Sequence, residues 1–219
     1  MITFKDIKDS NEIQTYIKKA DEALVELGYT EHSFAHVGKV ANHAREILLK
    51  LGYDERTAEL ARIAGYMHDI GNVVNRVDHA QSGAIMAFRI LDKMGMDVAE
   101  TATIISAIGN HDESTAVPVN EVAAALILAD KSDVRRSRVR NRELATFDIH
   151  DRVNYSVESS TLVIDTDNKF AVLHLKIDTE LFTIMDYFEI FLGRMLLCRR
   201  AAEFLKLRFK LVINEVELL

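Results

Sequence analysis

A histidine and an aspartate side by side at the end of an apolar segment are the residues of this chain best placed to perform chemistry. His68 and Asp69 follow Ala64–Met67 and precede Ile70 and Gly71. Ionisable side chains rarely occupy such a face unless a partner neutralises them. A metal ion would neutralise them, and imidazole combined with carboxylate suits iron, manganese, nickel, cobalt or zinc. The pair therefore predicts a metal site.

Other candidate ligands lie at predicted helix ends or on apolar faces: His36, His79, His111 and Asp130. Asp130 stands four residues after Leu126 and so shares its helix face, where an unpaired carboxylate is costly. His79 or His111 taken alone would more often be a hydrogen-bonded core residue. The chain has one cysteine, Cys198, which argues against a structural zinc site.

The order of these residues resembles the HD-domain superfamily of metal-dependent phosphohydrolases, which is all-helical and named for the adjacent pair. The similarity covers roughly residues 30–135, and Met67–Gly71 is a close copy of the central motif. The resemblance implies that one metal ion is held by His36, His68, Asp69 and Asp130.

Two further histidines resemble those of the binuclear branches of that superfamily. His79 opens a His-x-x-x-Gly step that ends at Gly83, and His111 lies in the segment 109–113. The resemblance implies a second ion held by His79 and His111, with Asp69 bridging the two ions.

The chain also departs from its relatives at two places. Asn72 stands where many relatives carry lysine, which removes one possible general acid or phosphate contact. No Gly-Tyr-Pro segment follows His111, so cyclic-di-GMP phosphodiesterase activity is rejected.

The implied activity is hydrolysis of a nucleotide or another small phosphate ester through a metal-activated water, with Asp69 orienting that water. His32, Lys131 and Arg76 are the candidates for protonating the leaving oxygen. Arginine binds phosphate in a bidentate manner, so Arg76 and the run that begins at Arg135 and Arg136 are candidate substrate contacts. The run continues through Arg138, Arg140 and Arg142, and a solvated face or a subunit contact explains it equally well.

Two other functions are compatible with the same ligands. The superfamily includes di-iron oxygenases with a very similar set of histidines and aspartates. A non-catalytic metal-binding sensor module would also retain the helical shell, although the intact ligand set argues against it.

Helical periodicity and capping residues indicate the elements that position these side chains. We expect helices over residues 11–27, 33–50, 54–67, 79–94, 98–108 and 121–131. Asp54, Asp78 and Asn120 are the expected N-caps of three of them, and Asp97 with Glu100 resembles a capping box.

The pattern changes near Asp151. Residues 162–164 and 170–177 read as a β-hairpin with a turn at 166–169, followed by a long amphipathic helix from about 180 to 207. Two strands do not stand alone, so the hairpin must pack on the helices or on another chain. We expect a mainly α fold: an HD-type helical bundle over residues 1–150 and a small α+β unit over 151–219. The long helix could pack into the core or form a homodimer contact.

Composition limits the partners of the chain. It has 219 residues, 48% hydrophobic and 28% charged, with a formal net charge of −7. This balance does not favour nucleic acid or an anionic membrane, so an anionic substrate requires a local cluster of positive charge. We expect a cytoplasmic protein, because no signal peptide or membrane-spanning run is visible and one cysteine allows no internal disulfide.

Overall fold

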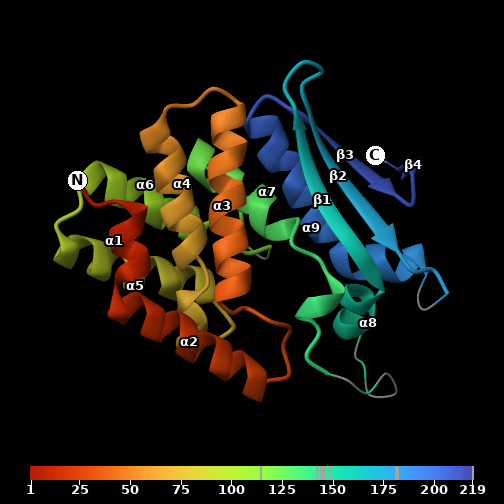
Figure 1. Cartoon of the computed structure of the whole chain (residues 1–219), viewed down its shortest axis with the longest axis horizontal. Coiled ribbons are helices and arrows are strands. Elements are labelled where there is room, and N and C mark those ends of the chain that lie inside the picture. The colour runs from red at the N-terminus through yellow and green to blue at the C-terminus, as the bar shows by residue number, and fades with distance from the viewer. Residues whose placement is uncertain (114, 142, 144–146, 148, 181–182, 219) are drawn as a thin grey trace.

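The protein consists of a helical bundle with a small β-sheet at one side (Figure 1). The structure, a computed structural model, describes residues 1–113, 115–141, 143, 147, 149–180 and 183–218. Its elements are α1 (Phe4–Asp9), α2 (Asn11–Glu26), α3 (Phe34–Lys50), α4 (Glu55–Met67), η1 (Ile70–Val73), α5 (His79–Met94), α6 (Val98–Gly109), α7 (Glu121–Lys131), η2 (Arg136–Arg138), α8 (Ile149–Ser156), β1 (Val157–Asp165), β2 (Phe170–Ile177), α9 (Ile184–Phe204), β3 (Arg208–Ile213) and β4 (Val216–Glu217).

The six helices expected from the sequence are present within one or two residues of the expected bounds. Asp54, Asp97 and Asn120 each accept a backbone N–H at the start of a helix, as expected. Asp78 does not: its φ is 57° and its side chain makes no capping hydrogen bond. Glu100 also leaves its expected capping box incomplete, because its carboxylate pairs with Arg56 of α4 instead.

Helix α7 runs through the centre of the bundle. Every residue from Val122 to Lys131 is buried, and α3, α4, α6 and α9 all pack against it (Figure 1). Its alanine-rich sequence allows these neighbours to approach from several sides. The ionisable end of this helix, at Asp130 and Lys131, is therefore enclosed by protein.

Helices α3 and α4 approach each other closely at Gly65. A Cβ atom built on Gly65 would lie 2.8 Å from the Cα of Ala41, a separation that real side chains do not tolerate. The absence of a side chain at this position lets the two helices pack backbone to backbone. This contact brings the start of α3 near the end of α4, where His36 and His68 lie.

The C-terminal part contains the expected hairpin and long helix, together with two strands that the sequence interpretation missed. Strands β1 and β2 pair antiparallel, β2 pairs parallel with β3, and β3 pairs antiparallel with β4. The expected turn at 166–169 joins β1 to β2. Helix α9 begins at Ile184 rather than near Glu180, with Thr183 as its N-cap, and residues 181 and 182 lie outside the described part of the chain.

The third strand explains how the hairpin is stabilised. Helix α9 connects β2 to the parallel strand β3, which is the crossover that parallel neighbours require. Alternate residues of β2 and β3 are buried, including Leu173, Leu175, Leu211 and Ile213, and they belong to the same apolar core as the bundle. One continuous core therefore joins the helices and the sheet.

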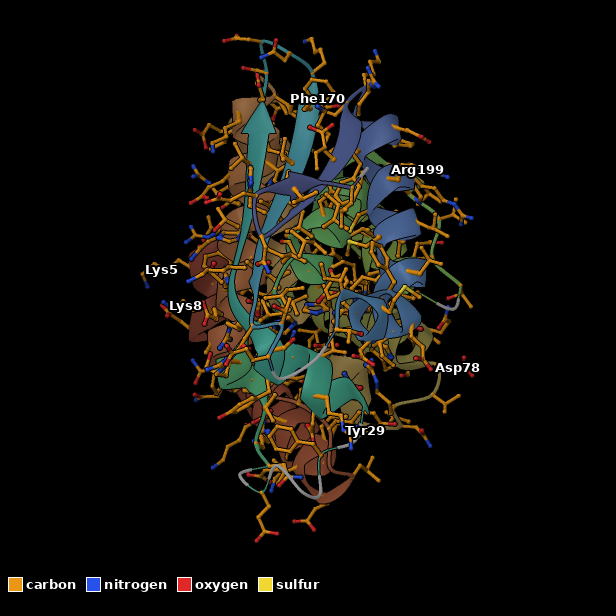
Figure 2. The ribbon with its side chains drawn as sticks, turned by 90° about the vertical axis from the view of Figure 1, so that its right-hand side faces the viewer. Lys5, Lys8, Tyr29, Asp78, Phe170 and Arg199 are labelled. Carbon is orange, nitrogen blue, oxygen red and sulfur yellow. The ribbon has the colours of Figure 1, made fainter. Side chains whose placement is uncertain are left out.

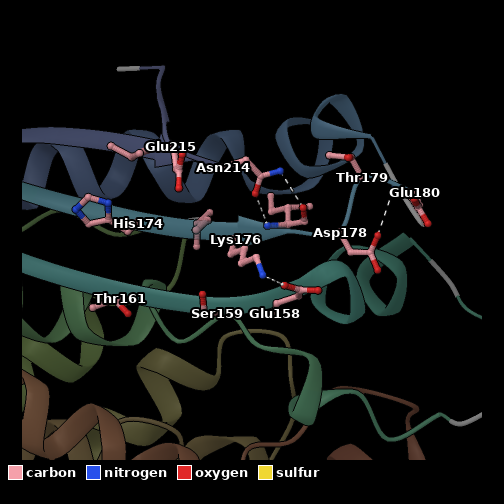
Figure 3. Close-up of a pocket in the computed structure, with 13 residues that line it drawn as sticks. Glu158, Ser159, Thr161, His174, Lys176, Asp178, Thr179, Glu180, Asn214 and Glu215 are labelled. Atoms are coloured by element: carbon pink, nitrogen blue, oxygen red, sulfur yellow. Dashed lines mark hydrogen bonds and ion pairs between the residues drawn. The ribbon is translucent and has the colours of Figure 1, made fainter.

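The sheet also carries a wide, open hollow of about 630 Å³ near the ends of β1 and β2 (Figure 3). Its polar side chains bond mainly to each other or to the backbone: Lys176 pairs with Glu158 at 2.7 Å, and Asn214 bonds the backbone of Ile177. His174 is exposed there and is not one of the candidate ligands. Within the described residues, no helix combines the length and apolar character needed to cross a bilayer.

Candidate metal centre

The six predicted ligands come from the ends of five helices and meet at one place. His36 lies in the first turn of α3, His79 begins α5, and Asp130 lies in the last turn of α7. His68 and Asp69 follow α4, and His111 follows α6. All six side chains are buried.

Four of these residues form the first group of converging donor atoms. Nε2 of His36 lies 3.3 Å from Oδ1 of Asp130 and 3.6 Å from Oδ2 of Asp69. Nε2 of His68 lies 3.1 Å from Oδ2 of Asp69 and 3.7 Å from Oδ1 of Asp130. Two imidazole nitrogens and two carboxylate oxygens thus surround one small volume.

The other two histidines face the opposite oxygen of Asp69. Nε2 of His79 lies 3.6 Å and Nε2 of His111 lies 4.0 Å from Oδ1 of Asp69, and the two nitrogens are 3.2 Å apart. Arg76 also approaches Nε2 of His79, with its Nη1 at 3.1 Å. A ligand role for His79 therefore requires this guanidinium to move.

The protein sets the tautomer of all four histidines in the same way. Each Nδ1 has a protein acceptor within 3.0 Å, so Nδ1 carries the hydrogen and Nε2 presents its lone pair to the centre. The acceptors, in order along the chain, are Oδ2 of Asp133 for His36, and the backbone carbonyls of Gly65 for His68, Arg76 for His79 and Ile108 for His111.

Several of these central atoms lack any hydrogen-bond partner. Nε2 of His36, Nε2 of His68 and Oδ2 of Asp69 are buried without one. Lone pairs that face each other in a buried site are unfavourable unless a cation lies between them. Two groups are tight enough to hold a metal ion, namely His36 with His68 and Asp130, and His68 with Asp69 and His111. Nitrogen and oxygen donors of this kind fit a divalent transition metal.

The pKa values of the two carboxyl groups are also compatible with a bound cation. Burial would raise the pKa of Asp69, but His68 and the other histidines hold it well below its ordinary value. Burial would likewise raise the pKa of Asp130, and Lys131 holds that pKa well below its ordinary value. Burial lowers the pKa of His111 to about 3, and it also lowers the pKa of His79. Both carboxylates are therefore ionised at neutral pH, while these two histidines are neutral.

A contact between glycines fixes the chain around Asp69. A Cβ atom on Gly71 would lie 2.0 Å from the carbonyl oxygen of His79 and 2.5 Å from the amide nitrogen of Gly83. Gly71 is thus required for the close approach of η1 to α5 and not as a helix cap. The amide of Asn72 donates to Oδ1 of Asp69 at 2.9 Å, so Asn72 orients the carboxylate.

A cavity of about 140 Å³ opens onto this centre. Of the catalytic and substrate candidates, Asp69, His32, Arg76 and Lys131 line it. Arg135 and Arg136, the other two candidate substrate contacts, do not line it. Arg135 pairs with Glu31 and Asp133, and Arg136 donates to the carbonyl of Tyr155 and pairs with Asp178. Arg138 of the same run does line the cavity, and Arg142 lies outside the described residues.

Three residues of the site were missed at the level of sequence. Asp133 follows Asp130 by three residues. This spacing places both carboxylates on the same side of the chain, and it could have indicated from the sequence that Asp133 belongs to the site. Glu113 lies two residues after His111 and binds Lys131 at 3.4 Å. Arg194 of α9 lines the cavity and donates to Glu113 at 2.7 Å, but it sits in an apolar helix without any motif.

Comparison with known proteins gives three findings. The family model of the HD domain matches residues 33–153. An uncharacterized protein of Methanocaldococcus jannaschii is 26% identical over 159 residues, which are 63% of this chain and 61% of that protein. The crystal structure of a predicted HD superfamily hydrolase from an uncultured Thermotogales bacterium is 28% identical, covers 57% of this chain and 67% of that chain, and has a TM-score of 0.45. The chain thus spans less than two thirds of the length of the archaeal relative.

Proposed function

The chain belongs to the HD-domain family, and from that premise we propose that it is a metal-dependent phosphohydrolase acting on a small phosphate ester. The observation that carries this proposal is the buried set of donor atoms without hydrogen-bond partners, next to a cavity that is lined by Asp69, Asp130 and basic side chains.

We propose two ion sites, one on each carboxylate oxygen of Asp69, and assign the ligands by the oxygen that they face. The first ion would be held by His36, His68, Oδ2 of Asp69 and Asp130, whose histidine nitrogens lie 3.1–3.7 Å from the carboxylate oxygens. The second would be held by His79, His111 and Oδ1 of Asp69. Asp69 would then serve both sites, and Asn72 holds its carboxylate in that orientation.

When bound, the metal ions would supply Lewis acidity and would lower the pKa of a water molecule. The protein side chains then position the substrate. His32 donates its Nδ1 hydrogen to the carbonyl of Thr30 at 2.7 Å, so its Nε2 is an acceptor that can orient a hydroxyl or water hydrogen in the cavity.

Lys131 supplies a permanent positive charge beside the centre. Burial would lower the pKa of its ammonium, but Asp130 and Glu113 raise it above its ordinary value. An ammonium group with a raised pKa holds its proton, so Lys131 stabilises charge on a phosphoryl oxygen. It is poorly suited to release that proton to a leaving group.

The size of the cavity restricts the substrate. Binding pockets for drug-sized ligands usually measure about 300–1,000 Å³, whereas this cavity measures about 140 Å³. A phosphoryl group and a few attached atoms fill such a space. A nucleotide fits only with its sugar and base outside the cavity.

Elemental analysis and activity assays test the proposal together. Protein purified without chelators should contain transition metal and should hydrolyse p-nitrophenyl phosphate when manganese or iron is supplied. Asp69→Ala should lose metal and activity together, and His111→Ala should lose the second ion first. His174→Ala, on the exposed face of the sheet, should retain both.

Two results would contradict the proposal. Full metal content in Asp69→Ala would show that the ligands are wrongly assigned. Oxygen consumption by the reduced iron form, without hydrolysis of phosphate esters, would instead identify an oxygenase.

A further inference from the structure

Helix α9 lies outside the segment matched by the HD-domain family, yet it contributes a basic residue to the cavity. Nε of Arg194 donates to Oε1 of Glu113 at 2.7 Å, and the guanidinium lies 4.3 Å from the centre of the Phe191 ring. The same oxygen of Glu113 accepts from Lys131 at 3.4 Å, and Lys131 contacts the proposed ligand Asp130 at 2.7 Å. A continuous chain of contacts thus joins α9 to the metal centre.

Most N–H groups of the Arg194 guanidinium lack an acceptor among the described residues. Arginine carries five N–H groups, and only the one on Nε has an acceptor among the described residues. Arg138 is more fully engaged, because it donates to the carbonyls of Glu31 and Asp133. Arg76 donates to Asn72 at 3.3 Å and lies against His79, on the metal side of the cavity. Arg194 is therefore the arginine outside the matched family segment that is best placed to take an additional anionic partner.

The charge of the cavity also favours an anion. Four carboxylates and four basic side chains line it, so the protein charges balance before any ion is bound; they are Asp69, Glu113, Asp130 and Asp151 against Arg76, Lys131, Arg138 and Arg194. Each divalent ion held at the centre adds two positive charges. The charge of one divalent ion would therefore be neutralised by a dianion. The charge of two ions would be sufficient for a dianion and a negatively charged nucleophile.

We propose that Arg194, together with Lys131, binds the terminal oxygens of a phosphoryl group, so that α9 completes the substrate site and selects phosphate monoesters over diesters. This inference rests on the proposed phosphohydrolase function. A monoester presents three terminal oxygens and two negative charges, enough for the metal centre and for a bidentate guanidinium. A diester presents only two terminal oxygens and one charge, and its second ester group needs space that a cavity of about 140 Å³ does not provide.

Glu113 acts as a positioning residue in this arrangement. It holds Arg194 and Lys131 on one oxygen, but its negative charge also competes with the substrate for both cations. If the ion pair were purely structural, Arg194→Met and Glu113→Gln would change phosphate affinity in the same direction. If Arg194 binds phosphate, Arg194→Met weakens phosphate binding, whereas Glu113→Gln does not, because it keeps an acceptor oxygen and removes the competing charge.

Binding of orthophosphate to the metal-loaded protein, measured by isothermal titration calorimetry, tests the inference without turnover. Arg194→Met should weaken binding about 10-fold to 100-fold, as expected for the loss of a charge-assisted bidentate contact. Glu113→Gln should leave binding unchanged or strengthen it. Arg199→Met is the matched control, because Arg199 lies on the outer side of the same helix near Glu203 (Figure 2); it should bind like the wild type.

A second variant keeps the test decisive if Arg194→Met does not fold. Arg194→Lys retains the charge and loses the bidentate geometry, so it should weaken phosphate binding by a smaller factor. Equal phosphate affinity in the wild type and in a folded Arg194 variant would overturn the inference, as would equal weakening by Arg194→Met and Glu113→Gln.

Activity measurements separate this inference from the proposed function. The ratio of kcat/KM for p-nitrophenyl phosphate to that for bis(p-nitrophenyl) phosphate should fall in Arg194→Met, because only the monoester uses the contact fully. If neither ester is hydrolysed but orthophosphate binding still depends on Arg194, the phosphohydrolase proposal fails and the phosphate site stands. If both esters are hydrolysed and the ratio does not change, the inference fails alone.

Discussion

Replacing Asp133 by asparagine should weaken metal binding about 10-fold to 100-fold, although Asp133 is not a proposed ligand. Its Oδ2 accepts from Nδ1 of His36 at 2.8 Å, and its Oδ1 accepts from Lys39 at 2.7 Å. The carboxylate is fully buried, which would raise its pKa, but the hydrogen bond from His36, the charge of Arg138 and the hydrogen bond from Lys39 hold that pKa below the ordinary value. An anionic acceptor on Nδ1 fixes the ring and makes the opposite nitrogen a stronger donor to a metal ion.

The expected magnitude follows from what asparagine preserves and what it removes. The amide oxygen can still accept from His36, so the ring keeps its orientation, but the negative charge is gone. Loss of such a partner costs about 10-fold to 100-fold in metal affinity, or about 1.4–2.7 kcal/mol at 1.36 kcal/mol per tenfold. Separately, the free energy of unfolding of the metal-free protein should fall by about 1–3 kcal/mol, because Lys39 and Arg138 lose the buried anion with which they pair.

Competition with a chromophoric chelator measures the metal affinity, and urea unfolding of the metal-free protein measures stability. Glu100→Gln is the control, since it breaks the ion pair with Arg56 between α4 and α6, away from the cavity. It should lower stability and leave metal affinity unchanged. If Asp133→Asn bound metal within about twofold of the wild type while losing stability, the carboxylate would be part of the packing only, and our reasoning about His36 would be wrong.

Three other predictions concern stability. Glu100→Gln should lower the free energy of unfolding by about 1 kcal/mol at neutral pH. Arg56 holds the pKa of Glu100 below its ordinary value of 4.5 in the folded state, so this stability is present above pH 4.5 and is lost as the pH falls through the folded pKa. Urea unfolding from neutral to acidic pH should therefore show the stabilities of the variant and the wild type converging. Gly71→Ala should cost at least about 1–3 kcal/mol through overpacking, whereas Gly193→Ala, with no atom within 4 Å of the added Cβ, should be neutral or stabilising in thermal unfolding. Chelation should destabilise the protein by about 2.7 kcal/mol if the ion is present at 100 times its Kd; an unchanged Tm would argue against a bound ion.

The local features of this protein were predictable from its sequence. The helices over α2 to α7 follow from apolar periodicity and from capping residues such as Asp54, Asp97 and Asn120, because these signals act within one or two turns of chain. The adjacent His68 and Asp69 were recognisable for the same reason. The four-residue spacing from Leu126 likewise indicated that Asp130 would face inward, as it does.

Other features depend on contacts between distant segments. Strand β3 alternates Phe209, Leu211 and Ile213 with more exposed residues, but no strand was expected there from the sequence. Only its pairing with β2, across the whole of α9, makes it the strand that stabilises the hairpin. Asp78 shows the opposite case: a residue type typical of an N-cap is held at positive φ by the path of the chain and makes no cap.

The sequence by itself determined which residues can hold a metal ion, since that depends on side-chain chemistry and on the helix end each residue occupies. The tertiary structure decided what surrounds them. It brought Asp133 within hydrogen-bond distance of His36, 97 positions away, and Arg194 within 2.7 Å of Glu113, 81 positions away. These pairs depend on how whole helices pack against one another, which no short pattern of residues encodes. For the same reason Arg135 and Arg136, close to the centre in sequence, lie outside the cavity, while an arginine of the last helix lines it.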